Sequence, residues 1–414
     1  MQPLASKILQ EANESYKNAD EMFKHSNIPL GNWLYNPKAI VSNSLDNSKK
    51  SLDDAKIAYK NAFYYYSISK AFQSKINSLF VIYACQYYNG TTIQQIYENV
   101  SKAVENARIA AKKAMLNGLV SLQCVGAAQQ RALEAEEYAN KSGQNKIDYL
   151  YYLAYATERS KTVDWWLSWC EKFNESYAVN ESWIGSMAEK YYDYAQNIIS
   201  YASILSEETG YSGKFISEAN DLLEKAYEQK EEYPASSLFN SLEAIANANL
   251  AIEMIGIEGD AVYDKLNRTS QMAGFAIEKA RNMSIEPVLA VSYAEFGRSF
   301  EKDDVKNALT YYKYAYMIAN MLCLATGYKG GKLEKNGIAV NEENNGKETD
   351  LDLFLTGGVG FVAGIAIGAV VAGRRRKYNI SNETNISNET ETVSYTHLRA
   401  HETRHDLVCR LLLE

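Results

Sequence analysis

The spacing of hydrophobic and polar residues along this chain predicts helices almost throughout. In TTIQQIYENVSKAVENARIAAKKAMLNG, which begins at Thr91, apolar residues recur every three or four positions, and this spacing places them on one face of an α-helix. They are Ile93, Ile96, Tyr97, Val100, Val104, Ala107 and Ala111. Thr91 and Gln94 have the spacing of a capping box, and Asn117 and Gly118 form a typical helix end. The pattern predicts an amphipathic helix with one face in a core.

The same pattern continues to residue 326. We expect further helices at 119–142, 147–173, 181–208, 213–231, 235–256, 259–283, 288–300 and 303–326. Small residues at Gly126, Ala127 and Ala128 would let a neighbouring helix approach closely. The short connections favour antiparallel neighbours, arranged as a bundle or as a solenoid of helical hairpins. No repeat of about 34 residues emerges, so tetratricopeptide repeats are not predicted. We therefore predict an all-α fold for residues 1–326.

One segment differs from the amphipathic helices because it carries no charge. LFLTGGVGFVAGIAIGAVVAG spans 353–373, and a helix of this length reaches roughly 30 Å, the thickness of a bilayer core. RRRK follows it at 374–377, and acidic residues precede it. The positive-inside rule then predicts a single-pass membrane protein with residues 1–350 outside the cell and a cytoplasmic C-terminus. A buried core helix is the alternative interpretation.

The remaining regions complete the domain organisation. The Gly, Lys, Asn and Glu-rich residues 327–350 are predicted to be a flexible linker, and 374–392 a basic and then low-complexity cytoplasmic tail. The glycines Gly360, Gly364 and Gly368 have the spacing that lets membrane helices pack closely, which would allow a homodimer or a contact with another membrane helix through this face. A simple glycine-rich anchor is the alternative.

The start of the chain does not fit an exported protein, because MQPLASKILQEANESYKNAD lacks the apolar stretch of an export signal. The stretch is itself typical of an amphipathic helix. Either the protein is tail-anchored and departs from the charge rule, or Met1 is an internal methionine of a longer protein. We favour the second interpretation.

The end of the chain contains a literal zinc-protease motif. His401, Glu402 and His405 form H-E-x-x-H, and His397 lies four residues earlier. A zinc site of this type needs a buried helix and a third ligand, but the preceding repeat is polar and only nine residues follow His405. The composition also changes near Val393, and residues 393–414 resemble translated sequencing-adaptor read-through. We therefore predict no metal site here.

Aromatic residues are the most unusual part of the composition. The chain has 32 tyrosines, many in clusters such as FYYYS, YLYYLAY and TYYKYAY. We favour rings that fill seams between helices with hydroxyls at the surface, and a sticky surface for peptides or sugars is the alternative. Trp165, Trp166 and Trp169 are likewise predicted to fill a core seam, with a binding groove or a membrane-interface contact as the alternative.

Other chemical signals point away from catalysis and cofactors. Phosphate-loop and G-x-S-x-G motifs are absent, and His25 is the only histidine before the tail. The formal charge of −8 is spread along the chain, which speaks against a nucleic-acid partner. Buried thiols are the default interpretation of four of the five cysteines, with one disulfide in an exported protein as an alternative. These four are Cys85, Cys124, Cys170 and Cys323. No catalytic, cofactor-binding or metal residue is predicted.

The stretch NAFYYYSISKAFQSKINSLFVIYACQYY, the Ala and Tyr-rich helices after it and the anchor followed by RRRK resemble a known family. The likeness is to the non-catalytic helical C-terminal region of archaeal membrane-anchored Lon-like serine proteases, and it covers about residues 1–377. In that family a Ser-Lys catalytic domain precedes such a region. No motif here matches its catalytic residues, so the resemblance implies that a catalytic domain lies upstream of Met1.

Three functions remain open from the sequence. The first is a membrane-anchored extracytoplasmic scaffold or interaction domain that binds a protein or peptide and is non-catalytic as written. The second is the C-terminal part of a membrane-anchored Lon-like protease. The third is an intracellular tail-anchored adaptor, which the arginine cluster argues against.

Overall fold

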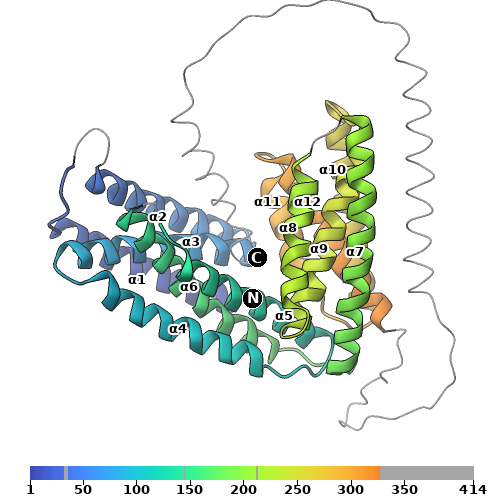
Figure 1. Ribbon diagram of the computed structural model, residues 1–414, viewed down its shortest axis with the longest axis horizontal. Helices are drawn as coiled ribbons and strands as arrows, with labels where there is room; N and C mark the ends of the chain where they lie inside the picture. Colours follow the sequence, from blue (N-terminus) through green and yellow to red (C-terminus); the bar gives the residue numbers. More distant parts are fainter. Residues whose placement is uncertain (32–35, 144, 211–212, 327–414) are drawn as a thin grey trace, which may run out of the picture.

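The computed structural model describes residues 1–31, 36–143, 145–210 and 213–326, and within these ranges it contains twelve α-helices and no β-strand (Figure 1). The helices are α1 (Gln2–Lys24), α2 (Pro37–Lys60), α3 (Tyr64–Tyr88), α4 (Ile93–Lys113), α5 (Leu119–Asn140), α6 (Lys146–Cys170), α7 (Glu181–Thr209), α8 (Lys214–Gln229), α9 (Pro234–Glu253), α10 (Asp260–Asn282), α11 (Val288–Phe300) and α12 (Val305–Ala325). The all-α class is confirmed, and the helices predicted from residue 119 onward begin and end close to the expected positions.

The predicted linker (327–350), membrane segment (353–373), tail (374–392) and terminal stretch (393–414) lie outside the described residues. Within the described ranges, no helix combines the length and the apolar character needed to cross a bilayer.

The helices form two groups that share a core. In Figure 1 the axes of α1–α6, the N-terminal group, run across the view, whereas those of α7–α12, the C-terminal group, run up it. Contacts of α5 with α9, and of α11 with α3 and α5, join the groups. The largest cluster of buried apolar side chains draws residues from both groups. The core is therefore continuous across the junction.

The predicted stripe of α4 is confirmed, but its capping box is formed one residue later than expected. Thr92 is the N-cap: its Oγ1 accepts a hydrogen bond from the Gln95 backbone N–H at 3.2 Å, and its own N–H donates to Gln95 Oε1 at 3.0 Å. Thr91 is not available for this role, because its N–H donates to the Gln86 carbonyl and so completes the end of α3. α4 also ends at Lys113, earlier than predicted, and Gly118 instead precedes α5.

The expected close approach at Gly126 is confirmed. A Cβ atom there would overlap with the ring of Phe239 on α9. The missing side chain thus lets α5 and α9 pack tightly where the two groups meet.

Four helices that lack a capping side chain of their own receive one from a distant part of the chain. They are α3, α5, α9 and α11. The acceptors are Glu295 for Tyr65 and Tyr66, Glu175 for Val120 and Ser121, Gln129 for Ser236, and Gln123 for Leu289. These bonds satisfy N–H groups that the first turn of a helix leaves without intrahelical partners.

Candidate functional site

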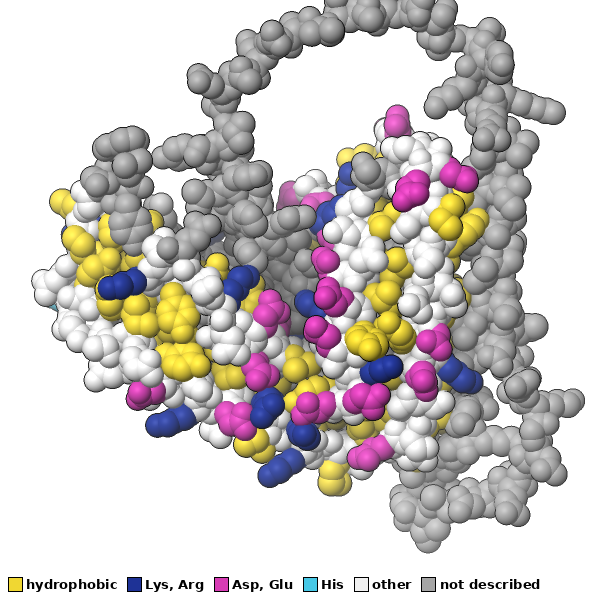
Figure 2. Space-filling view, viewed as in Figure 1, with side chains coloured by type: hydrophobic (Ala, Val, Ile, Leu, Met, Phe, Trp, Pro, Cys, Tyr) yellow, Lys and Arg dark blue, Asp and Glu magenta, His cyan; other side chains and the backbone are white. Residues whose placement is uncertain are grey.

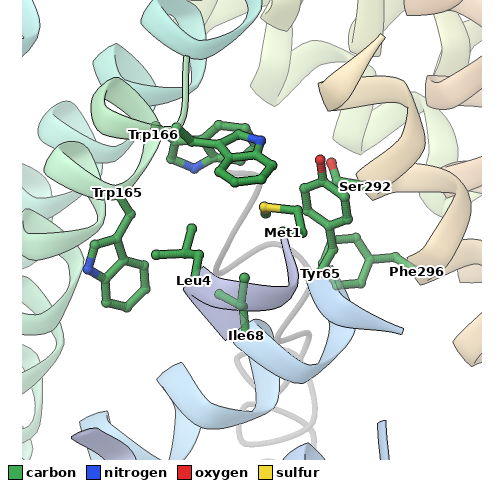
Figure 3. A pocket seen from close by; sticks show the side chains of 9 residues that line it. Met1, Leu4, Tyr65, Ile68, Trp165, Trp166, Ser292 and Phe296 are labelled. Carbon is green, nitrogen blue, oxygen red and sulfur yellow. The ribbon is translucent and has the colours of Figure 1, made fainter. Parts of the chain in front are cut away.

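The three tryptophans of α6 line a small apolar pocket (Figure 3). Trp166 is buried, and the Trp165 ring meets Phe72 edge-on with centroids 6.2 Å apart. In Figure 3 Met1 lies between Trp166 and Tyr65. The side chains therefore fill the seam between α6 and its neighbours, as predicted.

The size of this pocket argues against a ligand. Its volume is about 20 Å³. A single water molecule needs roughly 10–15 Å³ on this measure, so one water fits and a ligand side chain does not. The alternative of a tryptophan-lined binding groove finds no support in this arrangement.

Tyrosine rings fill helix seams as predicted, but several hydroxyls are buried rather than exposed. Tyr293 stacks on Tyr311 with centroids 5.9 Å apart, and its hydroxyl donates a hydrogen bond to Glu243. The Tyr155 hydroxyl donates to Glu134 in the same way. The prediction of surface hydroxyls is wrong at these positions, because carboxylates inside the fold provide acceptors that the sequence pattern does not show.

Two buried arginines, Arg131 on α5 and Arg159 on α6, lie close enough to interact electrostatically. Arg159 is fully buried and forms an ion pair with Glu134, with Nη2 2.5 Å from Oε2. Arg131 is also fully buried, yet none of its three guanidinium nitrogens has a hydrogen-bond partner among the described residues. Burial and the neighbouring Arg159 charge lower the pKa of Arg131 to about 9, against the opposing effect of Glu134. Arg131 is thus a charge whose burial is poorly compensated.

A much larger cleft opens between α5, α8 and the start of α9. Its volume is about 410 Å³. Its walls carry one lysine, Lys225, and five glutamates, namely Glu134, Glu136, Glu137, Glu228 and Glu232. Figure 2 shows acidic side chains on both sides of the region where the two groups meet. The cleft is therefore a concave surface of negative charge.

Only some of these carboxylates are already paired. Glu134 is engaged by Arg159, and Glu232 binds Lys112 with Nζ 2.7 Å from Oε1. The other three, Glu136, Glu137 and Glu228, form no ion pair with any described residue. We refer to the whole lined surface as the acidic cleft.

The base of the acidic cleft is a hydrogen-bonded chain of amides. Gln130 Nε2 donates to Asn240 Oδ1 at 2.7 Å, and Asn240 Nδ2 donates to Gln229 Oε1 at 2.8 Å. Gln130 is only 5% exposed, and its Oε1 has no hydrogen-bond partner among the described residues. A buried acceptor without a partner is costly, so the burial of this oxygen is not fully compensated.

Among the cysteine side chains that the structure describes, Cys124 departs from the default of a free buried thiol. Cys85 and Cys323 are buried and free, and burial raises the pKa of both thiols. Cys124, fully buried on α5, is disulfide-bonded. The side chain of Cys170 lies outside the described residues.

The remaining candidate residues are the histidines and the glycines of the expected membrane segment. His25 is exposed at the end of α1, and His397, His401 and His405 lie outside the described residues, as do the glycines of the expected membrane segment. The described residues contain no group of three or more His, Cys, Asp or Glu side chains arranged to hold a metal ion.

No family model, no curated protein and no solved structure matches the chain. The function is therefore argued from the acidic cleft and from the pattern of the sequence.

Proposed function

We propose that this chain is a membrane-anchored extracytoplasmic interaction domain whose helical body binds a protein or peptide partner and is itself non-catalytic. The observation that carries the proposal is the acidic cleft of about 410 Å³. Ligand pockets are typically concave with a volume of roughly 300–1,000 Å³ and contain a few convergent polar groups. The helical body, arranged as packed antiparallel helices, would serve as the rigid support of this cleft.

The disulfide at Cys124 supports a location outside the cytoplasm. Disulfides form and persist in oxidising compartments and are rare in the cytosol. The sequence supports the same orientation, because the apolar stretch 353–373 is followed by RRRK. In this arrangement the lipid bilayer is contacted through one helix, and Gly360, Gly364 and Gly368 provide a face for a homodimer.

The environment of one buried lysine, Lys75, supports a non-catalytic body. A lysine that acts as a general base needs a lowered pKa. Burial alone would lower the pKa of Lys75, but Glu158 and Glu11 outweigh it and raise the pKa instead. The ammonium lies 2.7 Å from Glu11 Oε2 and 3.2 Å from Glu158 Oε2. Lys75 is thus suited to structural ion pairing rather than to proton abstraction.

Two alternatives remain proposals. The first is that the chain is the C-terminal part of an archaeal membrane-anchored Lon-like serine protease, with the acidic cleft handling substrate for a catalytic domain upstream of Met1. The second is an intracellular tail-anchored adaptor. The disulfide at Cys124 argues against the second alternative, since cytosolic thiols are kept reduced.

The location can be tested on intact cells that express the full chain. Added protease should digest the helical body, and an epitope placed after the RRRK segment should survive. In a parallel measurement, Cys124 should resist alkylation in denaturant until a reductant is added. A body protected from protease together with a freely alkylated Cys124 would establish the adaptor instead.

A further inference from the structure

Asparagines followed two positions later by serine or threonine, the spacing that accepts N-linked sugars, are frequent in the helical body. Of the 26 asparagines in residues 1–326, eight have this spacing. Serine and threonine make up 39 of these 326 residues, so composition alone would give about three such sites. The eight acceptor sites are Asn13, Asn89, Asn99, Asn140, Asn174, Asn180, Asn267 and Asn282. Their number exceeds what an asparagine-rich composition explains.

The fold places these acceptor sites on the surface. Seven of the eight asparagines are exposed, and Asn13 is partly buried. The buried asparagines all lack the acceptor spacing, and they are Asn77, Asn240, Asn247 and Asn307. A bulky, hydrated oligosaccharide needs a side chain that projects into solvent. The exposed positions therefore meet the first requirement for attachment.

The backbone excludes the exposed sites that lie inside helices. A transferase must reach the asparagine amide and the hydroxyl two residues later together, but residues i and i+2 of an α-helix do not face each other. Asn99 and Asn267 lie within α4 and α10. Thr269, which supplies the hydroxyl for Asn267, is only 3% exposed and donates to the Lys265 carbonyl at 2.8 Å. The folded chain therefore withholds these two sites.

Three further exposed sites are less open. Thr91 and Ser176, which supply the hydroxyls for Asn89 and Asn174, are partly buried. The Asn180 side chain caps α7 by accepting a backbone N–H bond at 2.8 Å, which holds its amide against the start of the helix. These three sites present only part of what a transferase needs.

Two sites combine an exposed asparagine with an exposed hydroxyl beyond the helix. Asn140 is the last residue of α5 and Asn282 the last of α10, and Ser142 and Ser284 are both exposed. Lys141 leaves α5 in an extended conformation with ψ 121°, and Ser284 has φ 62°, so neither site continues as a helix. At both sites the asparagine and the hydroxyl are free of the helical separation.

We propose that the helical body carries N-linked oligosaccharides on Asn140 and Asn282. This inference rests on the proposed extracytoplasmic location, since such sites are modified in exported proteins. In the transfer, a bond forms between Nδ2 and C1 of the sugar. The bond from C1 to the phosphate of a lipid-linked donor breaks, the phosphate leaves with the bonding electrons, and Nδ2 loses one proton. Asn140 also lines the acidic cleft, so its oligosaccharide stands beside the proposed partner site.

The acceptor geometry is tested on the purified, folded full-length chain, with a single-subunit oligosaccharyltransferase and a lipid-linked oligosaccharide. The intact mass should rise by two oligosaccharides, and peptide mass spectrometry should place them on Asn140 and Asn282. The double variant Asn140→Gln and Asn282→Gln should lose both additions. The matched control, Asn99→Gln and Asn267→Gln, removes two exposed sites inside helices and should keep both additions.

Peptides separate the effect of the sequence from that of the fold. Synthetic peptides 263–271 and 278–286 contain Asn267 and Asn282, and both should be modified, because short free peptides do not hold a helix. In the folded chain only the second of these sites should react. Equal modification of Asn267 in the peptide and in the folded chain would overturn the proposal, as would bare Asn140 and Asn282 in the folded chain.

Intact cells distinguish this inference from the proposed location. The full chain, expressed in cells that make N-linked oligosaccharides, should carry them on Asn140 and Asn282. Acceptor sites also follow RRRK within residues 379–390, and these should stay bare if the C-terminus is cytoplasmic. Oligosaccharides on 379–390 alone would overturn the proposed location and this inference with it. A bare helical body that external protease still digests would overturn this inference and leave the location standing.

Discussion

Arg131 shows how one residue can oppose the fold that contains it. Its guanidinium is fully buried and has no hydrogen-bond partner among the described residues, so the cost of removing it from water is poorly offset. Replacing buried charges with apolar side chains of similar volume is often stabilising. We expect Arg131→Met to increase the free energy of unfolding by about 1–3 kcal/mol, measured by urea denaturation.

The control for this prediction is the neighbouring Arg159. Its ion pair with Glu134 is intact, so Arg159→Met should leave a buried carboxylate without its cation. Breaking such a pair costs about 3–5 kcal/mol. If both variants destabilise the protein to the same extent, Arg131 has a compensating partner and the interpretation of its burial is wrong.

Glu295 should make stability depend on pH. Burial raises its pKa to about 7, although the N–H groups of Tyr66 and Tyr65 and the Met1 ammonium act in the opposite direction. The folded state therefore holds this proton more tightly than the unfolded state, whose carboxyl titrates near 4.5. The associated stability is fully present below about pH 4.5 and is lost as pH rises through about 7.

Glu295→Gln tests this dependence without removing the cap, because both N–H bonds go to the single atom Oε2 and an amide oxygen can accept them. Between pH 5 and pH 8, the unfolding free energy of the unaltered chain should fall relative to that of Glu295→Gln by on the order of 2 kcal/mol. Parallel pH profiles for the two proteins would contradict the raised pKa.

At the scale of helices, the sequence predicts the features that depend on residues close together in the chain. The stripe that contains Val100 and Val104 is buried on α4 as expected, because periodicity alone places these residues on one face. The remote caps, meaning the capping side chains that come from distant parts of the chain, could not be predicted in this way. Glu295 and Tyr65 are 230 residues apart, and only the folded chain brings the carboxylate to the start of α3. The capping box of α4 forms one residue later than the pattern predicts for a similar reason, since the Thr91 N–H bonds the Gln86 carbonyl at the end of α3.

The remote cap of α5 gives a prediction at the same scale. Glu175 accepts hydrogen bonds from the N–H groups of Val120 and Ser121 at 3.0 and 2.5 Å. Glu175→Ala should lower the free energy of unfolding by about 1–2 kcal/mol, the usual cost of losing a capping side chain. Thermal unfolding of this variant can be compared with that of Glu189→Ala, an exposed glutamate on α7 that should have little effect.

For the whole molecule, the candidate site was much less predictable than the fold. Glu137 and Glu228 lie on the polar faces of separate helices, where isolated charges are normally solvated, and neither forms a recognisable motif. Their convergence depends on how α5 packs against α8 and α9. The tryptophan cluster gave a visible signal in the sequence, yet the structure uses it to fill a seam with a pocket of only about 20 Å³.

A prediction about chemistry follows at this scale. The full chain as written should not react with a serine-directed fluorophosphonate, because its sequence contains no recognisable nucleophile motif and the buried Lys75 is bound by two carboxylates that raise its pKa. A chain extended upstream by a Lon-like catalytic domain should react. Mass spectrometry of the labelled protein would locate any modified serine, and labelling of a single serine in the chain as written would overturn the non-catalytic proposal.

The remote caps also determine how the molecule can be divided. Gln129 and Gln123 of the N-terminal group complete α9 and α11, while Glu295 of the C-terminal group completes α3, so each group holds caps that the other requires. A cut in the connection between α6 and α7 would give two fragments that each expose unsatisfied helix ends and part of the shared core. Such fragments should be poorly ordered alone and recover helical structure only on mixing. This obligate complementation would make the two groups halves of one folding unit rather than exchangeable modules.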